Sequence, residues 1–301
     1  MKGLIAGIKR MEIHDGDGLR TTVFFKGCPL KCIWCHNPES ISRGVQIAYF
    51  KDKCIYCGEC ARSCSSGAIN MVDKRIITDG KKCSLCLNCV DACPTGARSF
   101  FGKEYSVTEL VDTVIDDKDF FINGSGGVTL SGGECLFQPN FAIEVAKEFY
   151  ARGVSVYIDT CGFAQKSVFE RILPYIDAFL YDVKAIDEKV HYNCTGQSNV
   201  LILDNLEFLL SKGTKVEIRF PLVKNYNDNQ TEKIGKYLSK FDNPPKIKVL
   251  KYHSFAGSRY LSLNMKNTLP QVETTNSDVQ NAVNILKNKY ALNAINGVTE
   301  S

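Results

Sequence analysis

The stretch of sequence that decides the fold is residues 21–35, which read TTVFFKGCPLKCIWC. A β-like run, Thr21–Phe25, leads into three cysteines with the spacing C-x3-C-x2-C, namely Cys28, Cys32 and Cys35. Three thiolates can hold a [4Fe–4S] cube and leave one iron without a protein ligand. An open coordination position distinguishes catalytic metal sites from structural ones. We therefore predict a catalytic iron–sulfur site directly after the first strand.

Similar β-like runs recur along the chain, and most of them precede a stretch with apolar residues at helical spacing. This alternation predicts a parallel sheet with right-handed crossovers. Six repeats fall short of a full eight-fold barrel, so we predict an α/β fold that forms an open or partial (β/α)6 TIM-like barrel. A doubly wound sheet is the alternative. The six runs are Thr21–Phe25, Val128–Ser131, Val154–Asp159, Ala178–Val183, Lys215–Leu222 and Ile247–Leu250.

Helix signals lie between these runs. Ser106 and Glu109 have the spacing of a capping box that opens a helix over Leu110–Asp117, and Ser167 with Glu170 predicts a second one. Apolar spacing also predicts helices over Phe141–Tyr150, Asn199–Ser211, Gln230–Phe241 and Ser277–Tyr290.

The connection between the first and second strands is far longer than an ordinary βα loop. It contains an internal repeat, because Cys54–Ala68 recurs 29 residues later as Cys83–Ala97 with the same cysteine spacing. A segment with so few aliphatic residues cannot build a stable core without cross-links such as bound metal. We predict an inserted, ferredoxin-like domain over residues 45–105 that metal holds together, and a barrel formed by residues 1–44 and 106–301.

Each repeat carries C-x2-C-x2-C-x3-C, the bacterial ferredoxin spacing, in which the fourth cysteine ligates the other cluster. Zinc is the alternative, but zinc sites prefer two C-x2-C pairs separated by about a dozen residues or more. The duplicated spacing favours two [4Fe–4S] clusters with crossed ligands. The predicted ligand sets are Cys54, Cys57, Cys60 and Cys93 for one cluster, and Cys83, Cys86, Cys89 and Cys64 for the other.

Cysteine is also the anomaly of the composition. The 301 residues include 14 cysteines, yet 44% hydrophobic and 23% charged residues are typical of a globular protein. We see no leader and no membrane-spanning run, so we expect a reducing cytoplasm and metal-bound thiolates instead of disulfides. The formal net charge of +4 falls to about −1 once eleven thiolates hold three clusters, so it does not indicate a nucleic-acid partner.

The predicted strands share a further property, because each of them ends in polar or metal-binding residues. In barrels of parallel strands, active residues gather at the C-terminal strand ends. A purely structural role does not explain such groups on every strand. The residues concerned are Cys28, Gly132, Gly133, Glu134, Asp159, Asp182, Lys184, Arg219 and His253.

With these motifs the chain resembles the radical S-adenosylmethionine (SAM) enzymes, and specifically the activating enzymes of glycyl radical enzymes. The resemblance covers nearly the whole length and includes His14–Thr21, Phe25–Pro29 and Trp34–Ser40. Many members of this family carry proline where Asp17 stands in this chain. The resemblance implies the same partial barrel, with SAM bound at the strand ends.

The resemblance also implies roles for individual residues. Gly132, Gly133 and Glu134 would hold the methionine amine of SAM. Arg219 would bind a carboxylate, since its fork can bond both oxygens. His253 would contact the ribose or adenine side.

On the neighbouring strands, Asp182 and Lys184 would engage the ribose and carboxylate region of SAM. Asp159 and Asp182 would hold a monovalent cation in such enzymes, and Trp34 with His36 would line the adenine pocket. The complete set of expected cofactor-binding residues is Trp34, Cys35, His36, Gly132, Gly133, Glu134, Asp159, Asp182, Val183, Lys184, Arg219 and His253.

Each of these residues also has a plainer interpretation. Two adjacent glycines are more often a turn than a ligand loop. Asp182 and Lys184 share one face of a strand and can form an ordinary ion pair. His253 can be a surface histidine and Trp34 a core residue. Only their order along six strands, after the C-x3-C-x2-C motif, favours a binding site.

The implied activity is activation of a partner glycyl radical enzyme. One electron from the reduced cluster cleaves SAM, and the resulting 5′-deoxyadenosyl radical removes a Cα hydrogen from one glycine of the partner. The expected cofactors are three [4Fe–4S] clusters, SAM and a monovalent cation. A low-potential donor such as flavodoxin or ferredoxin would supply the electron under anaerobic conditions, and we expect neither a nucleic-acid nor a membrane partner.

Two other functions compete with this interpretation. A radical SAM enzyme acting on a small molecule, or installing another protein modification, would cleave SAM without forming a glycyl radical. A multi-cluster electron carrier would not bind SAM at all. The inserted clusters can relay electrons, support the fold or help to dock the partner, and the sequence does not choose among these roles or among substrates of the partner.

Overall fold

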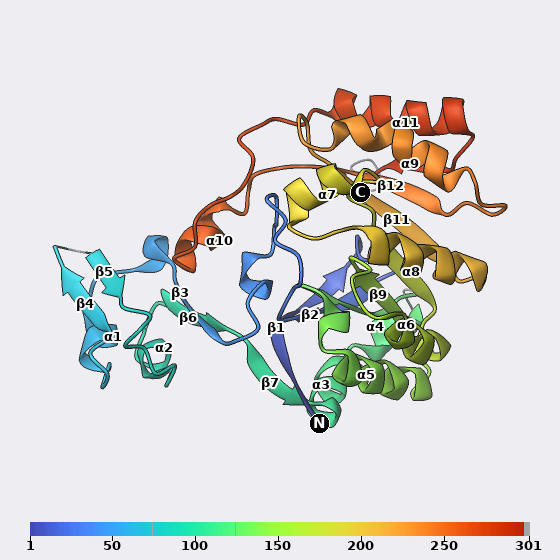
Figure 1. The fold of residues 1–301 in the computed structure, drawn as a ribbon. Helices are drawn as coiled ribbons and strands as arrows, with labels where there is room; N and C mark the ends of the chain where they lie inside the picture. Colours follow the sequence, from blue (N-terminus) through green and yellow to red (C-terminus); the bar gives the residue numbers. More distant parts are fainter. Residues whose placement is uncertain (74, 124, 298–301) are drawn as a thin grey trace.

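The computed structural model of the chain describes residues 1–73, 75–123 and 125–297. Within these residues, an open nine-stranded sheet has the order β13-β12-β11-β10-β9-β8-β2-β1-β7 (Figure 1). The six predicted runs correspond to parallel strands of this sheet, and β13 (Ala294–Asn296) adds a further parallel strand at its edge. The bounds of the six are β2 Arg20–Phe25, β8 Gly127–Gly132, β9 Ser155–Thr160, β10 Ala178–Asp182, β11 Val216–Leu222 and β12 Lys246–Lys251.

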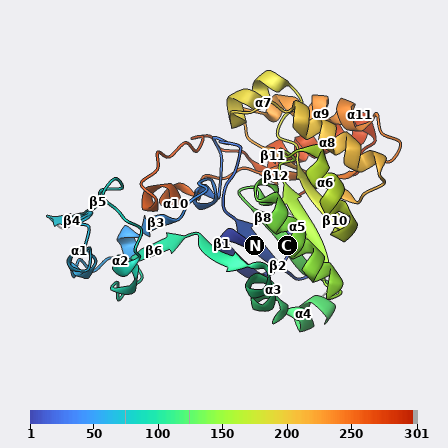
Figure 2. The ribbon, with the colours of Figure 1, turned by 60° about the horizontal axis from the view of Figure 1, so that its bottom comes forward.

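These parallel strands lie side by side in the order in which they occur along the chain. Right-handed crossovers that all proceed in one direction place their helices on one face of the sheet. Figures 1 and 2 show the helices gathered on that side. The doubly wound alternative requires a reversal of direction and is therefore wrong, whereas the partial barrel is confirmed. The helices are α5 Pro139–Ala151, α6 Lys166–Ile172, α8 Val200–Ser211, α9 Thr231–Leu238 and α11 Asn276–Tyr290.

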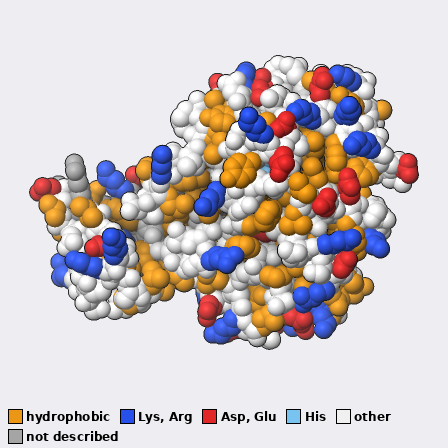
Figure 3. Space-filling model, viewed as in Figure 1, with side chains coloured by type: hydrophobic (Ala, Val, Ile, Leu, Met, Phe, Trp, Pro, Cys, Tyr) orange, Lys and Arg blue, Asp and Glu red, His pale blue; other side chains and the backbone are white. Residues whose placement is uncertain are grey.

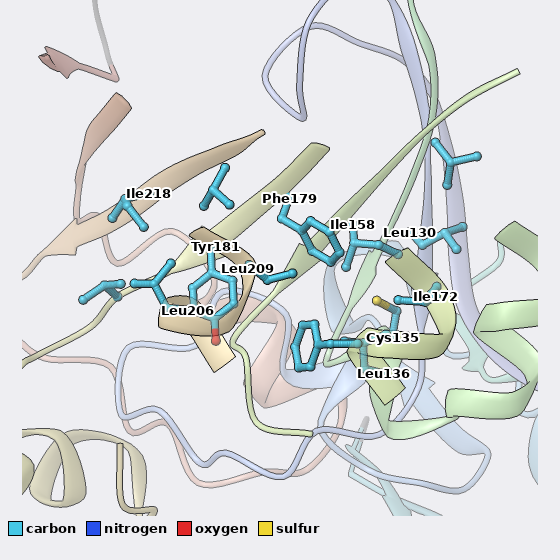
Figure 4. Packing of buried hydrophobic residues seen from close by; sticks show 14 of the residues in the cluster. Leu130, Cys135, Leu136, Ile158, Ile172, Phe179, Tyr181, Leu206, Leu209 and Ile218 are labelled. Atoms are coloured by element: carbon cyan, nitrogen blue, oxygen red, sulfur yellow. The ribbon is translucent and has the colours of Figure 1, made fainter. Parts of the chain in front are cut away.

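The main apolar core lies between the sheet and these helices (Figure 4). Leu130, Ile158 and Phe179 from neighbouring strands are fully buried. They share one cluster with Ile172 of α6 and Leu206 of α8. Burying one such side chain stabilises a fold by about 1.5–3 kcal/mol. This layer therefore fixes the strands whose ends carry the predicted site.

The sequence does not predict the strands β1 (Lys2–Glu12) and β7 (Lys103–Ser106) at the other edge of the sheet. β1 pairs antiparallel with both β2 and β7. Most of its side chains are exposed or half-buried, so it lacks the apolar run that marks the parallel strands. Directly after β7, the predicted capping box is confirmed, because Ser106 and Glu109 cap each other's backbone at the start of α3 (Val107–Ile115).

The second predicted capping box is wrong. Helix α6 has Gln165 as its N-cap, in an extended conformation, so Ser167 already lies inside the helix and cannot cap it. The remaining helices were not predicted. They are α4 Lys118–Asn123, α7 Glu188–Thr195 and α10 Gly257–Ser262, with short 3-10 turns at Pro38–Ser40, Lys51–Lys53, Cys135–Phe137, Leu173–Tyr175 and Asp228–Gln230.

Residues 46–101, part of the long connection between β2 and β8, project from the sheet as a separate lobe (Figures 1 and 2). Its stem is an antiparallel pair in which Gln46 lies opposite Phe101. A second hairpin and two short helices form its outer part. The elements of the lobe are β3 Gln46–Tyr49, α1 Glu59–Arg62, β4 Ile69–Val72, β5 Arg75–Thr78, α2 Asn88–Asp91 and β6 Arg98–Phe101.

The surface of the larger lobe carries both signs of charge. Figure 3 shows lysine, arginine and acidic side chains scattered over the face that is seen in Figure 1. Among the described residues, no helix is both long enough and apolar enough to cross a bilayer.

Candidate active site

A pocket of about 670 Å³ opens at the C-terminal ends of the parallel strands. This volume suits a ligand the size of a nucleotide. Side chains from β9, β10 and β11 and from the loops after β2 and β12 form its wall. It brings together these residues of the predicted site: Cys28, Cys32, Trp34, Cys35, His36, Gly132, Gly133, Asp159, Asp182, Lys184, Arg219 and His253.

The loop that carries the three cysteines is held by the rest of the chain. The backbone N–H of Lys31 donates to the carbonyl of Thr195 at 2.8 Å, and that of Ile33 donates to Cys194 at 3.0 Å, both in α7. From α10, the Tyr260 hydroxyl donates to the carbonyl of Cys35 at 3.0 Å. The position of the loop thus depends on two helices that the sequence does not predict.

The chemistry of these thiols fits a cationic metal cluster. Burial raises the pKa of Cys28 well above its ordinary value, and it raises that of Cys35 to about 12. Such groups ionise only when a positive charge compensates for the lost water. Among the described residues, no three His, Cys, Asp or Glu side chains converge as they do around a single metal ion. The three thiols instead line one side of the pocket.

Gly132 and Gly133 let the end of β8 lie directly against the cysteine loop. Gly132 has a φ of +120°, and a Cβ there would lie 2.2 Å from the backbone nitrogen of Phe25. A Cβ on Gly133 would lie 2.4 Å from the carbonyl oxygen of Ser40. Larger residues would push the strand away from the loop. Both glycines line the pocket with backbone atoms.

Glu134 does not line the pocket, contrary to the expectation that it holds the SAM amine. It is 1% exposed, and its carboxylate accepts hydrogen bonds from the hydroxyl of Thr160 (2.9 Å) and the N–H groups of Cys161 (2.8 Å) and Leu136 (3.0 Å). Burial raises its pKa, against these hydrogen bonds. Glu134 therefore braces the ends of β8 and β9 beneath the pocket.

Val183 is the other predicted residue that lies outside the pocket. Successive side chains of a strand point to opposite faces, so Asp182 and Lys184 line the pocket while Val183 is buried in the apolar core. Lys184 donates to Asp182 at 2.5 Å and is only 6% exposed. Although burial opposes its charge, Asp182 raises the pKa of Lys184. The pair is an ordinary ion pair, but it lies in the pocket wall.

Arg219 and Asp159 form a second charged pair in the pocket wall. Arg219 Nη1 lies 3.6 Å from Asp159, and the hydroxyl of Ser131 donates to the same carboxylate at 2.6 Å. Burial raises the pKa of Asp159 to about 6, although Arg219 opposes this shift. A monovalent cation between Asp159 and Asp182 would share these carboxylates with Arg219 and Lys184.

The turn between β1 and β2 forms the floor of the barrel, which sequence reasoning missed. Asp15 accepts from the hydroxyl of Thr22 at 2.9 Å, and its carbonyl accepts from Thr129 at 2.6 Å. Arg219 Nη2 donates to the carbonyl of His14 at 2.7 Å. In the sequence, His14 and Asp15 stood out only because they belong to a segment that resembles the family. That resemblance does not reveal that the turn folds inward.

An aromatic wall closes the other side of the pocket. The rings of His36 and His253 stack with centroids 4.1 Å apart, and Phe255 continues the stack at 4.6 Å. Trp34 is 6% exposed and packs with Tyr252 in a satellite apolar cluster, so it is a core residue that also lines the pocket. Flat rings of this kind suit a purine base. The sequence analysis missed Phe255.

A smaller cavity lies in the projecting lobe. Its wall includes four cysteines from both sequence repeats, and these are the four that the ferredoxin spacing assigns to one cluster: Cys64, Cys83, Cys86 and Cys89.

The other four cysteines of this lobe occupy different environments. Cys60 is buried beside Cys89, whereas Cys57 is exposed. Cys54 accepts the backbone N–H of Tyr56 at 3.4 Å, and Cys93 accepts that of Arg98 at 3.3 Å.

The two repeats of this lobe share unusual backbone angles. Tyr56 and Leu85 have φ values of 58° and 57°, and Gly58 and Leu87 have 81° and 64°. Left-handed angles at non-glycine residues are uncommon and persist where the surroundings require them. The repeats therefore present their cysteines on loops of the same shape.

The chain is similar to known proteins over most of its length. The model of the radical SAM superfamily matches residues 22–238. The chain is 42% identical to the trans-4-hydroxy-L-proline dehydratase activating enzyme of Clostridioides difficile, over 86% of this chain and 87% of that protein. It is 38% identical to the choline trimethylamine-lyase activating enzyme of Oleidesulfovibrio alaskensis, over 87% of each.

Among solved structures, Streptococcus suis SuiB bound to its precursor peptide SuiA aligns with a TM-score of 0.53 at 13% identity, over 89% of this chain and 46% of that one. This likeness shows the fold alone. The sequence relatives and the family model together identify the chain: it belongs to the radical SAM superfamily and, within it, to the activating enzymes of glycyl radical enzymes.

Proposed function

We propose that this chain installs a radical on one glycine of a partner glycyl radical enzyme. One observation carries the proposal: the thiols of the C-x3-C-x2-C loop and the polar ends of the parallel strands line the same pocket. A [4Fe–4S] cluster bound to Cys28, Cys32 and Cys35 supplies the electron for reductive cleavage of SAM, whose 5′-deoxyadenosyl radical takes the glycine hydrogen.

The chain's own residues bind and orient SAM. Arg219 and Lys184 are two of the buried cations in the pocket wall, and they would bind the carboxylate of the methionine moiety. The backbone of Gly132 and Gly133 leaves room for the methionine amine beside the cysteine loop. The turn that carries His14 and Asp15 would close the floor of the pocket beneath SAM and limit the access of water.

The aromatic wall would hold the adenine. His36 and His253 offer stacked rings, and Trp34 lies beside them against the apolar cluster. The Nε2 atom of His36 lies 2.6 Å from the carbonyl oxygen of His253, which fixes the orientation of its ring.

Two further [4Fe–4S] clusters in the inserted domain, residues 45–105, are part of the proposal. The cavity with Cys64, Cys83, Cys86 and Cys89 supports the crossed ligand set, and the shared backbone angles support an equivalent site at Cys54, Cys57, Cys60 and Cys93. We propose that these clusters relay electrons to the pocket from a low-potential donor such as flavodoxin or ferredoxin, in the cytoplasm.

The test measures the product radical directly. The reconstituted, reduced protein is incubated anaerobically with SAM and a peptide from the glycine loop of a glycyl radical enzyme, and electron paramagnetic resonance (EPR) spectra are recorded. We expect the doublet of a glycyl radical together with 5′-deoxyadenosine. Cys32→Ala should abolish both, because it removes one of the three cluster ligands.

The matched control is Cys135→Ala, which removes a buried cysteine outside the three ligand sets. It should keep its iron and its activity. Cleavage of SAM without the doublet would favour a radical enzyme that acts on a small molecule or on another protein site. Failure to bind SAM at all would favour an electron carrier.

A further inference from the structure

Arg98, the first residue of β6, is a buried cation with unused hydrogen-bond donors. Its side chain is 2% exposed. The Nη1 atom donates to the Thr78 hydroxyl at 2.9 Å, but Nε and Nη2 are buried and bond to no described residue. A buried guanidinium without acceptors is costly, and native structures almost always pair such groups.

The guanidinium lies between the two groups of cysteines in the inserted domain. Thr78, its hydrogen-bond partner, lines the cavity with Cys89, and the pKa of Cys89, which burial raises, is lowered by the charge of Arg98. On its other side the guanidinium lies 4.9 Å from the ring centroid of Tyr49, its cross-strand neighbour. The Tyr49 hydroxyl in turn interacts with Cys54.

The other repeat has an apolar residue at the equivalent position. Counting from the fourth cysteine, Cys93 precedes Arg98 by the same interval as Cys64 precedes Ile69. The preceding turns are alike, since the equivalent residues Gly67 and Gly96 have φ values of 62° and 65°. Ile69 is 7% exposed and lines the same cavity. The two repeats thus have similar loops, but only one of them has a buried cation, Arg98, at this position.

We propose that Arg98 donates Nε–H and Nη2–H hydrogen bonds to sulfurs of the cluster held by Cys64, Cys83, Cys86 and Cys89, and raises its reduction potential above that of the other inserted cluster. The inference rests on the two inserted clusters of the proposed function. The hydrogen bond to Thr78, a wall residue of that cavity, places the Nη1 end of the guanidinium beside this cluster.

The physical reason is electrostatic. Reduction adds one electron and therefore one negative charge to the cluster. A fixed positive charge and N–H donors stabilise the reduced form more than the oxidised form, and net charge and hydrogen bonds to sulfur are known to set cluster potentials. Arg98 keeps its charge over the whole working range of pH. The two inserted clusters would therefore be unequal, although their ligands are repeats of one another.

The test is a redox titration of the full-length, reconstituted protein with dithionite and mediators, followed by EPR at each potential. Arg98→Gln removes the charge and keeps a polar side chain. We expect the reduction equilibrium of one inserted cluster to fall at least tenfold, which corresponds to about 59 mV for a one-electron couple. Arg98→Lys keeps the charge and should shift it less. The control is Lys103→Gln, which removes an exposed positive charge outside the cavity and should leave both potentials unchanged.

Iron content separates the possible failures. Wild-type protein that holds only one cluster per chain would overturn the inserted clusters of the proposed function, and this inference with them. Fully loaded Arg98→Gln with unchanged potentials would overturn the inference alone.

A second experiment assigns the shifted signal to one of the two clusters. The titration is repeated in the Cys86→Ala background, where the shifted signal should disappear. A shift that persists there would mean that Arg98 acts on the other cluster. If Arg98→Gln loses its iron, the potentials of Arg98→Lys are measured instead. An unchanged potential in Arg98→Lys would exclude a role for the guanidinium donors.

Discussion

The barrel and the inserted domain hold their cysteines in different ways. The loop of Cys28, Cys32 and Cys35 is fixed by hydrogen bonds to α7 and α10, and it packs against the satellite apolar cluster of Trp34 and Tyr252. The inserted domain buries little more than Cys60, Ile69 and Cys89 in its own small cluster. A domain with so small a core obtains much of its folding free energy from metal binding. The chain itself thus shapes the loop of Cys28, Cys32 and Cys35, whereas the inserted loops would depend on the clusters that we propose there.

The largest effect on activation is expected when cluster ligands of the inserted domain are removed and the barrel is left unchanged. In the double variant Cys57→Ala with Cys86→Ala, each predicted inserted cluster loses one ligand. If these clusters relay electrons, activation should survive with dithionite as reductant and fail with flavodoxin or ferredoxin, as measured by the glycyl EPR doublet.

A different result in that double variant would assign another role to the inserted domain. Loss of activation with both reductants, together with rapid proteolysis within residues 45–105, would show that the clusters act as structural staples. Equal activity with both reductants would exclude a relay. Cys194→Ala, a buried cysteine outside the predicted sets, serves as the control.

A moderate effect is expected in the pocket itself. Arg219 is 8% exposed, and its Nε has no hydrogen-bond partner among the described residues. Arg219→Lys keeps the charge but removes the planar fork. SAM binding should weaken about tenfold, or about 1.4 kcal/mol, by anaerobic titration calorimetry. The exposed Arg171→Lys on α6 is the control, and equal affinities would contradict the carboxylate-binding role of Arg219.

The smallest effect concerns Asp17, the residue that stands where many relatives have proline. Its carboxylate accepts from Lys215 at 2.7 Å and from the hydroxyl of Tyr157 at 2.9 Å, so it ties the β1–β2 turn to β9 and to the start of β11. Both charged side chains are largely exposed. Asp17→Asn should therefore cost no more than about 1 kcal/mol at pH 7.

The pH dependence of this effect has a definite sign. The hydrogen bond from Lys215 holds the pKa of Asp17 below its ordinary value of 3.8, although burial opposes the shift. The stabilisation is therefore fully present above pH 3.8 and disappears as the pH falls through the lowered pKa. Urea unfolding of iron-free protein at pH 7 and at low pH should show the difference between Asp17→Asn and wild type only at pH 7, with the exposed Asp242→Asn as control.

The parallel strands and the residues at their ends could be predicted because they follow simple rules. Each buried parallel strand is a continuous apolar run, and all strand ends of such a sheet meet at one edge. This placed residues as distant in sequence as Cys28 and His253 in one pocket. Strand β1 could not be found in this way, because its half-exposed side chains carry no apolar run.

The exceptions are residues whose role depends on a neighbour in space. Glu134 follows two pocket glycines, but its carboxylate turns away to Thr160 and Cys161. Strand alternation alone would have placed Val183 in the core, between two pocket residues. Arg98 gave no sequence signal, because only the burial of its side chain shows that its donors are unused.

The geometry of the stem of the inserted domain determines how easily that domain can be lost or replaced. Gln46 and Phe101 are direct antiparallel partners, so the chain enters and leaves the projecting lobe at adjacent points. Paired residues of this kind have Cα atoms about 4.5–5.5 Å apart. A tight turn could join the same two positions without moving β2 or β8. The inserted lobe is therefore an exchangeable cassette, which can be removed, replaced or duplicated while the main sheet keeps its topology.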